Sequence, residues 1–238
     1  MEHLISVSTT TDPQTRQATT AILPIGSFEQ HGPYLPLTTD TLIACIISRN
    51  IAAAYPVLEL SPLTITCSHE HKAWPGTVSV SAQTLHKLVS DIFQSLQESG
   101  VGKLVLINAH GGNYVLRNIV QEASVRGPCM ALFPGSTQWA AARAAASITT
   151  TDHQDMHAGE LETSILLHAF PEAVRTGYEA ADHTADDRTD LLTLGMKHYT
   201  ESGIIGRPSL ASAAKGKAVL ASLVNSFADC LQTITGEQ

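Results

Sequence analysis

Basic residues are scarce in this chain of 238 residues. Only 14 residues are Lys or Arg, against 22 that are Asp or Glu, and the net charge at pH 7 is −8. The basic residues do not cluster anywhere, so the sequence offers no positive surface for the phosphates of a nucleic acid. We therefore expect no nucleic-acid partner.

Long hydrophobic runs are also missing. No uninterrupted apolar run approaches the ~18 residues that a membrane-spanning helix needs. The first residues, MEHLISVSTTTDPQTR, lack the basic and apolar regions of a signal peptide. We expect a protein of the cytoplasm that is not associated with a membrane.

The cysteine pattern excludes a disulfide framework. The chain has four cysteines, none of them in a C-x-x-C pair, and each lies among apolar residues: Cys45, Cys67, Cys129 and Cys230. Such residues are typical of buried free thiols in a reducing compartment. They are not expected to bind metal. Aromatic residues are only 5% of the chain, so aliphatic side chains must fill the core.

Strand-like and helix-like segments alternate along most of the chain. The apolar patterns predict strands at 20–26, 57–60, 63–67, 78–80, 103–109 and 129–133, and helices at 40–55, 81–100, 114–126, 139–146, 160–170 and 214–234. This alternation favours an α/β fold with a mostly parallel central sheet. The length suits a single domain over residues 1–238, in which residues 1–18 form a loose N-terminal arm.

Two predicted strands end in segments that suit metal binding. The first strand runs into GSFEQHGPYLPLTTD, where Glu29 and His31 stand two apart and so point to one side of an extended chain. Asp40 ends this segment at the start of the next helix. Another strand ends in NAHGGN, which contains His110. Parallel strands open their sites at their carboxyl ends, so these four side chains are expected to converge.

Each of these residues also has an ordinary explanation. Glu29 and His31 suit solvated loop positions, Asp40 suits a helix N-cap, and His110 suits a strand-end histidine bonded to backbone. The shared placement at strand ends and the set of oxygen and nitrogen ligands favour a metal site over these separate roles.

The segment DMHAGELETS adds a third group. His157 and Glu160 are three residues apart, so on a helix they would share a face, and Glu162 would point elsewhere. An imidazole beside a carboxylate suits metal binding or proton transfer. The loop SHEHKAWPGT either adds ligands or lines a substrate pocket, and the ordinary alternative is a polar lid. Serine-hydrolase chemistry is disfavoured, because no G-x-S-x-G turn occurs.

Five ordered segments together resemble the creatininase family of metal-dependent amidohydrolases. They are GSFEQHGPYLPLTTD, EHKAWPGT, NAHGGN, HAGELETS and GIIGRPSLASAAKG, and the resemblance runs from about Ala21 to about Leu220. The resemblance implies a three-layer α/β sandwich and two divalent ions per chain, with zinc expected first and manganese or iron as alternatives. It also implies a homo-oligomer, often a hexamer.

The resemblance further implies how the residues divide between the two ions. Glu29, Asp40 and His110 would bind one ion, His31 and Asp40 the other, and Asp40 would bridge them. The creatinine-hydrolysing members complete the second site with a glutamate where this chain has Gly112. We expect Glu160 to replace that glutamate.

The expected reaction is hydrolysis of a C–N bond in a small linear or cyclic amide, such as a formamide, a lactam or a modified peptide. His157 matches the family's catalytic histidine, and it or Glu160 would move the proton. The residues expected to bind substrate are Ser68, His71, Trp74, Gly111, Gly112 and His153. His153 stands where the creatinine-hydrolysing members have a tryptophan, so creatinine is not expected as the substrate. The alternatives are ring opening of a cyclic ketone on the same ions and a non-catalytic metal-binding scaffold.

Overall fold

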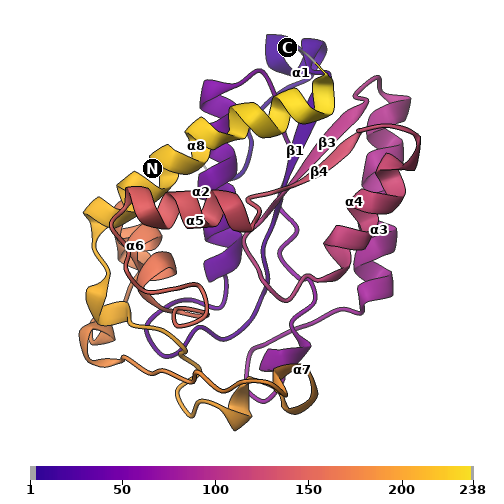
Figure 1. Ribbon diagram of the computed structural model, residues 1–238. Helices are drawn as coiled ribbons and strands as arrows, with labels where there is room; N and C mark the ends of the chain where they lie inside the picture. Colours follow the sequence, from indigo (N-terminus) through magenta and orange to yellow (C-terminus); the bar gives the residue numbers. More distant parts are fainter. Residues whose placement is uncertain (1–3, 237–238) are drawn as a thin grey trace.

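The centre of the molecule is a four-stranded parallel sheet. The computed structural model describes residues 4–236, and it orders the strands β2-β1-β3-β4 with every pairing parallel (Figure 1). The strands are β1 (Thr20–Ile25), β2 (Leu58–Glu59), β3 (Lys103–Asn108) and β4 (Met130–Phe133). The predicted α/β fold with a parallel sheet is thereby confirmed.

Helices cover both faces of this sheet (Figure 1). One face carries α3 (Ala82–Glu98) and α4 (Val115–Ala123), and the other carries α2 (Thr39–Ala54), α5 (Ser136–Ala145), α6 (Glu160–Ala169) and α8 (Ala213–Thr235). Two short helices, α1 (Pro13–Gln17) and α7 (Leu191–Leu194), lie outside these layers. The architecture is the expected sandwich of three layers.

The alternation of side chains along β1 divides the core in two. Ala21, Leu23 and Ile25 pack with the residues of α3 and α4, whereas Ile22 packs with those of α2 and α8. Successive side chains of a strand point to opposite faces, so a strand buried on both faces must be apolar at every position. This explains why β1 is apolar without interruption from Ala21 to Ile25.

The predicted helix at 81–100 is confirmed as α3, with Ser81 as its cap. The Ser81 hydroxyl accepts the N–H of Thr84 at 3.2 Å, which satisfies one free donor of the first turn. The inner face is made of Leu85, Val89, Phe93 and Leu96. Leu88, whose helical spacing also suits this apolar stripe, is 40% exposed, because the stripe is wider than the face that meets the sheet.

Two of the predicted strands do not form. In the segments 63–67 and 78–80, only Leu63 and Val78 make isolated bridges, to Ile25 and Phe28. Ile25 is the last residue of β1, so no strand remains beyond it for these segments to pair with. They form instead a loop that returns along the carboxyl end of the sheet.

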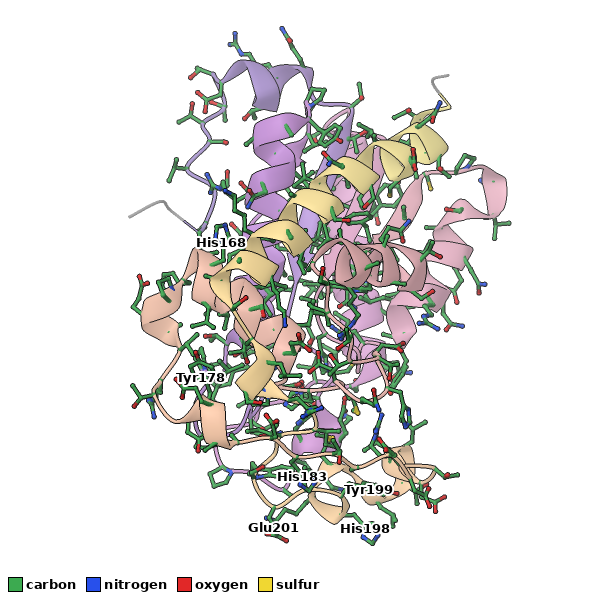
Figure 2. All side chains as sticks on the ribbon, turned by 60° about the vertical axis from the view of Figure 1, so that its left-hand side comes forward. His168, Tyr178, His183, His198, Tyr199 and Glu201 are labelled. Carbon is green, nitrogen blue, oxygen red and sulfur yellow. The ribbon has the colours of Figure 1, made fainter. Side chains whose placement is uncertain are left out.

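The chain between α6 and α8 is almost free of regular structure. It contains α7 and short 3₁₀ turns, and it folds across the end of the molecule where α7 is labelled (Figure 1). Figure 2 shows His183, His198, Tyr199 and Glu201 together in this part of the chain. Among the described residues, no helix is both long and apolar enough to cross a membrane.

Candidate metal centre

The loop after β1 carries Glu29 and His31 into the interior. Both residues are fully buried, and the Glu29 N–H donates to the carbonyl of Leu37 at 3.0 Å, which folds the loop back on itself. Asp40 lies in the first turn of α2 and is 2% exposed. The fold thus places Asp40 beside Glu29 and His31, which precede it by about ten positions.

Two groups of side chains meet on Asp40. One consists of Glu29, Asp40 and His110, and the other of His31, Asp40 and Glu162. Within each group, one oxygen or nitrogen atom per residue lies within 4.8 Å of the others. The His31 Nε2 atom is 3.1 Å from Asp40 Oδ1, and the His110 Nδ1 atom is 3.0 Å from Asp40 Oδ2. Each oxygen of one carboxylate therefore faces a different imidazole.

Backbone carbonyls orient both of these imidazoles. His31 Nδ1 lies 3.1 Å from the carbonyl oxygen of Glu29, and His110 Nε2 lies 2.7 Å from that of Cys67. A carbonyl only accepts hydrogen bonds, so the ring nitrogen facing it carries a proton. The remaining nitrogens, His31 Nε2 and His110 Nδ1, are free to bind a metal, in the arrangement usual for histidine ligands.

The surroundings of the Glu29 carboxylate indicate whether the cluster can hold a cation. Neither of its oxygens accepts a hydrogen bond among the described residues, although His71 Nε2 and His110 Nε2 each lie 3.2 Å away. A buried carboxylate without hydrogen bonds is costly unless a positive charge compensates it. The donor set of carboxylates and imidazoles fits a divalent ion such as zinc, manganese or iron.

The pKa values of the cluster residues also indicate that positive charge stabilises this site. Burial raises the pKa values of Glu29 and Glu162 to about 7. Burial alone would lower the pKa of both metal-facing histidines, but Asp40 raises that of His31 to about 9, and Glu29 with Asp40 raises that of His110 to about 10. In return, His31 and His110 hold the pKa of Asp40 well below its usual range, despite its burial. Imidazolium protons or divalent cations can supply this charge.

Two further histidines, His71 and His157, adjoin the cluster and are neutral. Burial, reinforced by neighbouring histidines, holds the pKa of each well below its usual range. The Nε2 atom of His157 lies 2.7 Å from the backbone carbonyl of Gln30, so its proton is on Nε2. The unprotonated Nδ1 atom of His157 lies 3.9 Å from Glu29 Oε1 and faces the cluster.

The structure corrects the expectation for Glu160. The Glu160 side chain is 1% exposed and binds Lys215 Nζ at 2.5 Å and Thr150 Oγ1 at 2.6 Å, away from the cluster. Glu162, expected to point elsewhere, is the carboxylate that joins His31 and Asp40. One oxygen of Glu162 accepts the N–H of Ala158 at 2.6 Å, which orients the carboxylate.

The reason for this difference is the start of α6. The helix begins at Glu160, and Ala158 before it has a φ of 53°, in the left-handed region that ends helical geometry. His157 therefore lies outside the helix, and the rule that residues three apart share a face does not apply to it. The predicted helix at 160–170 already began at Glu160, so the error was to extend helical spacing back to His157, across Gly159.

A pocket of about 470 Å³ opens onto the cluster. Of the residues predicted to bind substrate, His71, Gly111, Gly112 and His153 line it. Ser68 and Trp74 do not line this pocket. Ser68 is fully buried and its N–H donates to Ser79 Oγ, while the Trp74 ring lies under Lys197 Nζ at 5.4 Å.

Gly112 lies close to the side chains of His110 and Glu70. A Cβ atom at this position would lie 2.5 Å from His110 Nε2 and 2.0 Å from Glu70 Oε1. The Glu70 carboxylate thus occupies the space beside Gly112. Glu70, in the loop expected to add ligands or line the pocket, does line it, whereas sequence reasoning gave no role to Gln30, Tyr114, Glu162 and Arg188.

Comparison with known proteins gives the family. The model of the family Creatininase, described as creatinine amidohydrolase, matches residues 7–231. The chain belongs to the creatininase family. It is accordingly a hydrolase that acts on carbon–nitrogen bonds, and the predicted enzyme class is confirmed.

Individual relatives differ in what they act on. The mycofactocin precursor peptide peptidase of Mycobacterium ulcerans (strain Agy99) is 33% identical over 90% of this chain and 83% of its own length. The creatinine amidohydrolase of Pseudomonas putida is 24% identical over 89% of this chain and 88% of its own length. Membership of the creatininase family therefore does not identify the substrate.

Solved creatininase structures share the fold. A crystal structure of creatinine amidohydrolase (creatininase) superposes with a TM-score of 0.77 at 24% identity, covering 92% of this chain and 91% of that one. A manganese creatininase gives a TM-score of 0.76 at 23% identity, covering 92% of each chain. A mutant creatininase of the Zn-Zn type gives 0.73 at 23% identity, covering 90% of this chain and 89% of that one.

Proposed function

We propose that this creatininase-family hydrolase cleaves the C–N amide bond of a small linear or cyclic amide, or of a modified peptide, at a site for two divalent ions. The observation that carries the proposal is the meeting of two ligand groups on Asp40. Glu29 and His110 would hold one ion with Asp40, and His31 and Glu162 would hold the other. Zinc is proposed first, since zinc and manganese occur in creatininase structures and the donor set suits both.

The chemistry that such ions supply is activation of a water molecule and polarisation of the scissile carbonyl. His157 supplies the proton transfer. Its Nε2–H is held by the Gln30 carbonyl, so the lone pair of Nδ1 is directed towards the cluster. A neutral imidazole can take the proton of the attacking water at Nδ1 and return it to the leaving nitrogen.

Backbone groups beside the cluster supply further stabilisation. Gly111 and Gly112 line the pocket directly after His110, and neither carries a side chain that would block access to its N–H. These donors would bind the oxyanion that forms at the carbonyl carbon. His153 and Arg188 line the same pocket, and the Arg188 guanidinium donates to the His153 carbonyl at 2.8 Å. They would contact the part of the substrate away from the scissile bond.

Relatives and pocket size support a substrate larger than a simple formamide. The peptide peptidase relative supports a modified peptide, and a pocket of about 470 Å³ has room for one or two amino-acid residues. The homo-oligomer, often a hexamer, that the family resemblance implies remains part of the proposal, and so does the cytoplasmic location expected from the sequence.

The test is metal analysis combined with a substrate panel. Purified protein would be assayed on formamides, lactams, short modified peptides and cyclic ketones. The His157→Ala variant should lose roughly 10²- to 10⁴-fold in kcat while keeping both ions. The matched control is His86→Ala, because His86 lies on the surface, away from the cluster, and pairs with Glu122.

Three outcomes would contradict the proposal. Full turnover by His157→Ala would remove its proton-transfer role. Turnover of cyclic ketones alone would favour the ring-opening alternative. A protein that holds one ion per chain and is inert on every amide would favour a binding scaffold.

A further inference from the structure

We propose that Gln30 is a positioning residue whose side-chain amide fixes the tautomer of His71, so that the protonated Nε2 atom of His71 lies beside Glu29 and does not bind metal. Gln30 stands between two candidate ligands in the sequence and is 4% exposed. The inference rests on the proposed function, because it assigns Gln30 a role in the same hydrolysis.

Two backbone groups determine the positions of the oxygen and the nitrogen of the Gln30 side-chain amide. Gln30 Oε1 lies 2.9 Å from the backbone nitrogen of Gly32, and Gln30 Nε2 lies 3.0 Å from the carbonyl oxygen of Gly203. A backbone N–H only donates and a carbonyl only accepts. The amide oxygen must therefore face Gly32, and the NH₂ group must face Gly203.

This orientation determines the proton on His71. Gln30 Nε2 lies 2.9 Å from His71 Nδ1, and it can only donate there. His71 Nδ1 is consequently unprotonated, and the proton of this neutral ring is on Nε2. That atom lies 3.2 Å from Glu29 Oε1, so its proton is close to the carboxylate, although the two groups are not aligned as a hydrogen bond.

The hydrogens of the amide are then fully accounted for. Gln30 Nε2 also lies 3.2 Å from His157 Nε2, but this histidine nitrogen already carries a proton, which it donates to the Gln30 backbone carbonyl. One amide hydrogen goes to His71 and the other to Gly203. A glutamate at position 30 could accept from Gly32 but could not make either donation while ionised.

Gly203 leaves the space that this arrangement needs. Its φ is +89°, and a Cβ atom there would lie 1.8 Å from Gln30 Oε1. The segment GIIG therefore closes directly over the amide. Partners that orient the groups around a metal typically change metal affinity or activity by about 10- to 100-fold when mutated, which sets the effect expected here.

The first experiment reads the tautomer directly. The protein would be labelled with ¹⁵N-histidine, and long-range ¹H–¹⁵N spectra would be recorded for wild type and for a His71→Gln variant that assigns the signals. We expect His71 to be protonated on Nε2 and unprotonated on Nδ1. A proton on Nδ1 in wild type would overturn the inference, and this measurement needs no variant at Gln30.

The second experiment changes the donor. Gln30→Glu keeps the side-chain shape, offers His71 Nδ1 an acceptor, and should move the proton of His71 from Nε2 to Nδ1 with a fall in kcat of about 10- to 100-fold. Gln83→Glu makes the same charge change on the exposed face of α3 and should leave both unchanged. An unshifted His71 signal with kcat within twofold of wild type would overturn the inference.

The two proposals can fail separately. If wild type holds no metal or cleaves no amide, yet His71 shows the Nε2–H form and Gln30→Glu moves it, the proposed hydrolysis fails and the positioning of His71 by Gln30 stands. If the amides are cleaved and the His71 proton does not respond to residue 30, the reverse holds.

Discussion

A single carboxylate, that of Asp40, connects the two ligand groups. It is 2% exposed, accepts the Ser27 hydroxyl at 2.7 Å, and faces both metal-facing histidines. Burying an ionised carboxylate costs several kcal/mol, so it is stable there only with good hydrogen bonds and opposite charge close by. Its position at the start of α2 adds the favourable field of the helix N-terminus.

At this scale, the neighbouring glutamates Glu160 and Glu162 should behave in opposite ways. Glu162→Gln should lower kcat by about 100-fold or more while changing the free energy of unfolding by less than about 1 kcal/mol, because one charge is lost from the ligand group. Glu160→Gln should keep turnover and lower the free energy of unfolding by about 1–3 kcal/mol, since its bond to Lys215 is weakened.

Amide turnover and urea denaturation of the two variants make this comparison, and each variant is the control for the other. A large loss of turnover in Glu160→Gln, with none in Glu162→Gln, would contradict this assignment. It would support Glu160 as the metal ligand, as expected from the sequence.

The cysteines give a second prediction at residue scale. Burial, with a smaller effect from Glu59, raises the pKa of Cys45 to about 12, and burial raises that of Cys230 to about 11. A raised pKa leaves the thiol neutral, so at pH 8 the thiolate of Cys45 should be roughly three orders of magnitude scarcer than in an unperturbed cysteine.

Timed alkylation of the folded protein, followed by peptide mass spectrometry, measures this. Cys45 should be modified last and should react readily once the protein is unfolded in urea. Modification of Cys45 in the folded protein at the rate of a free thiol would contradict the burial described for it.

At the scale of elements, the turn before α6 decides which carboxylate enters the cluster. Asp155 caps this helix, since its Oδ1 accepts the N–H of Glu160 at 2.5 Å and its Oδ2 that of Leu161 at 3.0 Å. Arg143 from α5 pairs with the same carboxylate at 3.0 Å. These contacts hold the segment that carries His157 and Glu162.

Asp155→Ala should therefore affect both stability and the site. It removes the cap and leaves the buried Arg143 guanidinium without its carboxylate, so the free energy of unfolding should fall by about 3–5 kcal/mol. Asp155→Asn keeps one acceptor for the helix N–H groups and should lose less. Denaturant unfolding measures both, and a loss below about 1 kcal/mol in Asp155→Ala would contradict the capping role.

The turn before α6 also separates what could be predicted from the sequence from what could not. The strands and the helices α2, α3 and α8 follow from apolar periodicity, and the rule for parallel sheets was enough to bring Glu29, His31, Asp40 and His110 to one edge. Glu162 was missed because its direction depends on a left-handed residue and a cap that no periodicity encodes. Gln30 was missed because its partners are up to 173 positions away in the sequence.

At the scale of the whole molecule, the site is assembled from segments spread over the entire chain. The loops after β1 and β3, the start of α6 and the GIIG segment all meet at the carboxyl end of the sheet, and α7 borders the pocket (Figure 1). Formation of the site therefore requires the complete fold. The homo-oligomer expected from the family resemblance remains a prediction, because the structure is that of a single chain.

The most direct test is the number of divalent ions per chain, measured by mass spectrometry of the metals in wild type and in Asp40→Ala, with amide hydrolysis measured on the same samples. Wild type should hold two ions and hydrolyse at least one amide of the panel. Asp40→Ala should remain folded, lose both ions because it removes the shared carboxylate, and lose turnover. Two ions per chain retained in Asp40→Ala would contradict the proposed bridge.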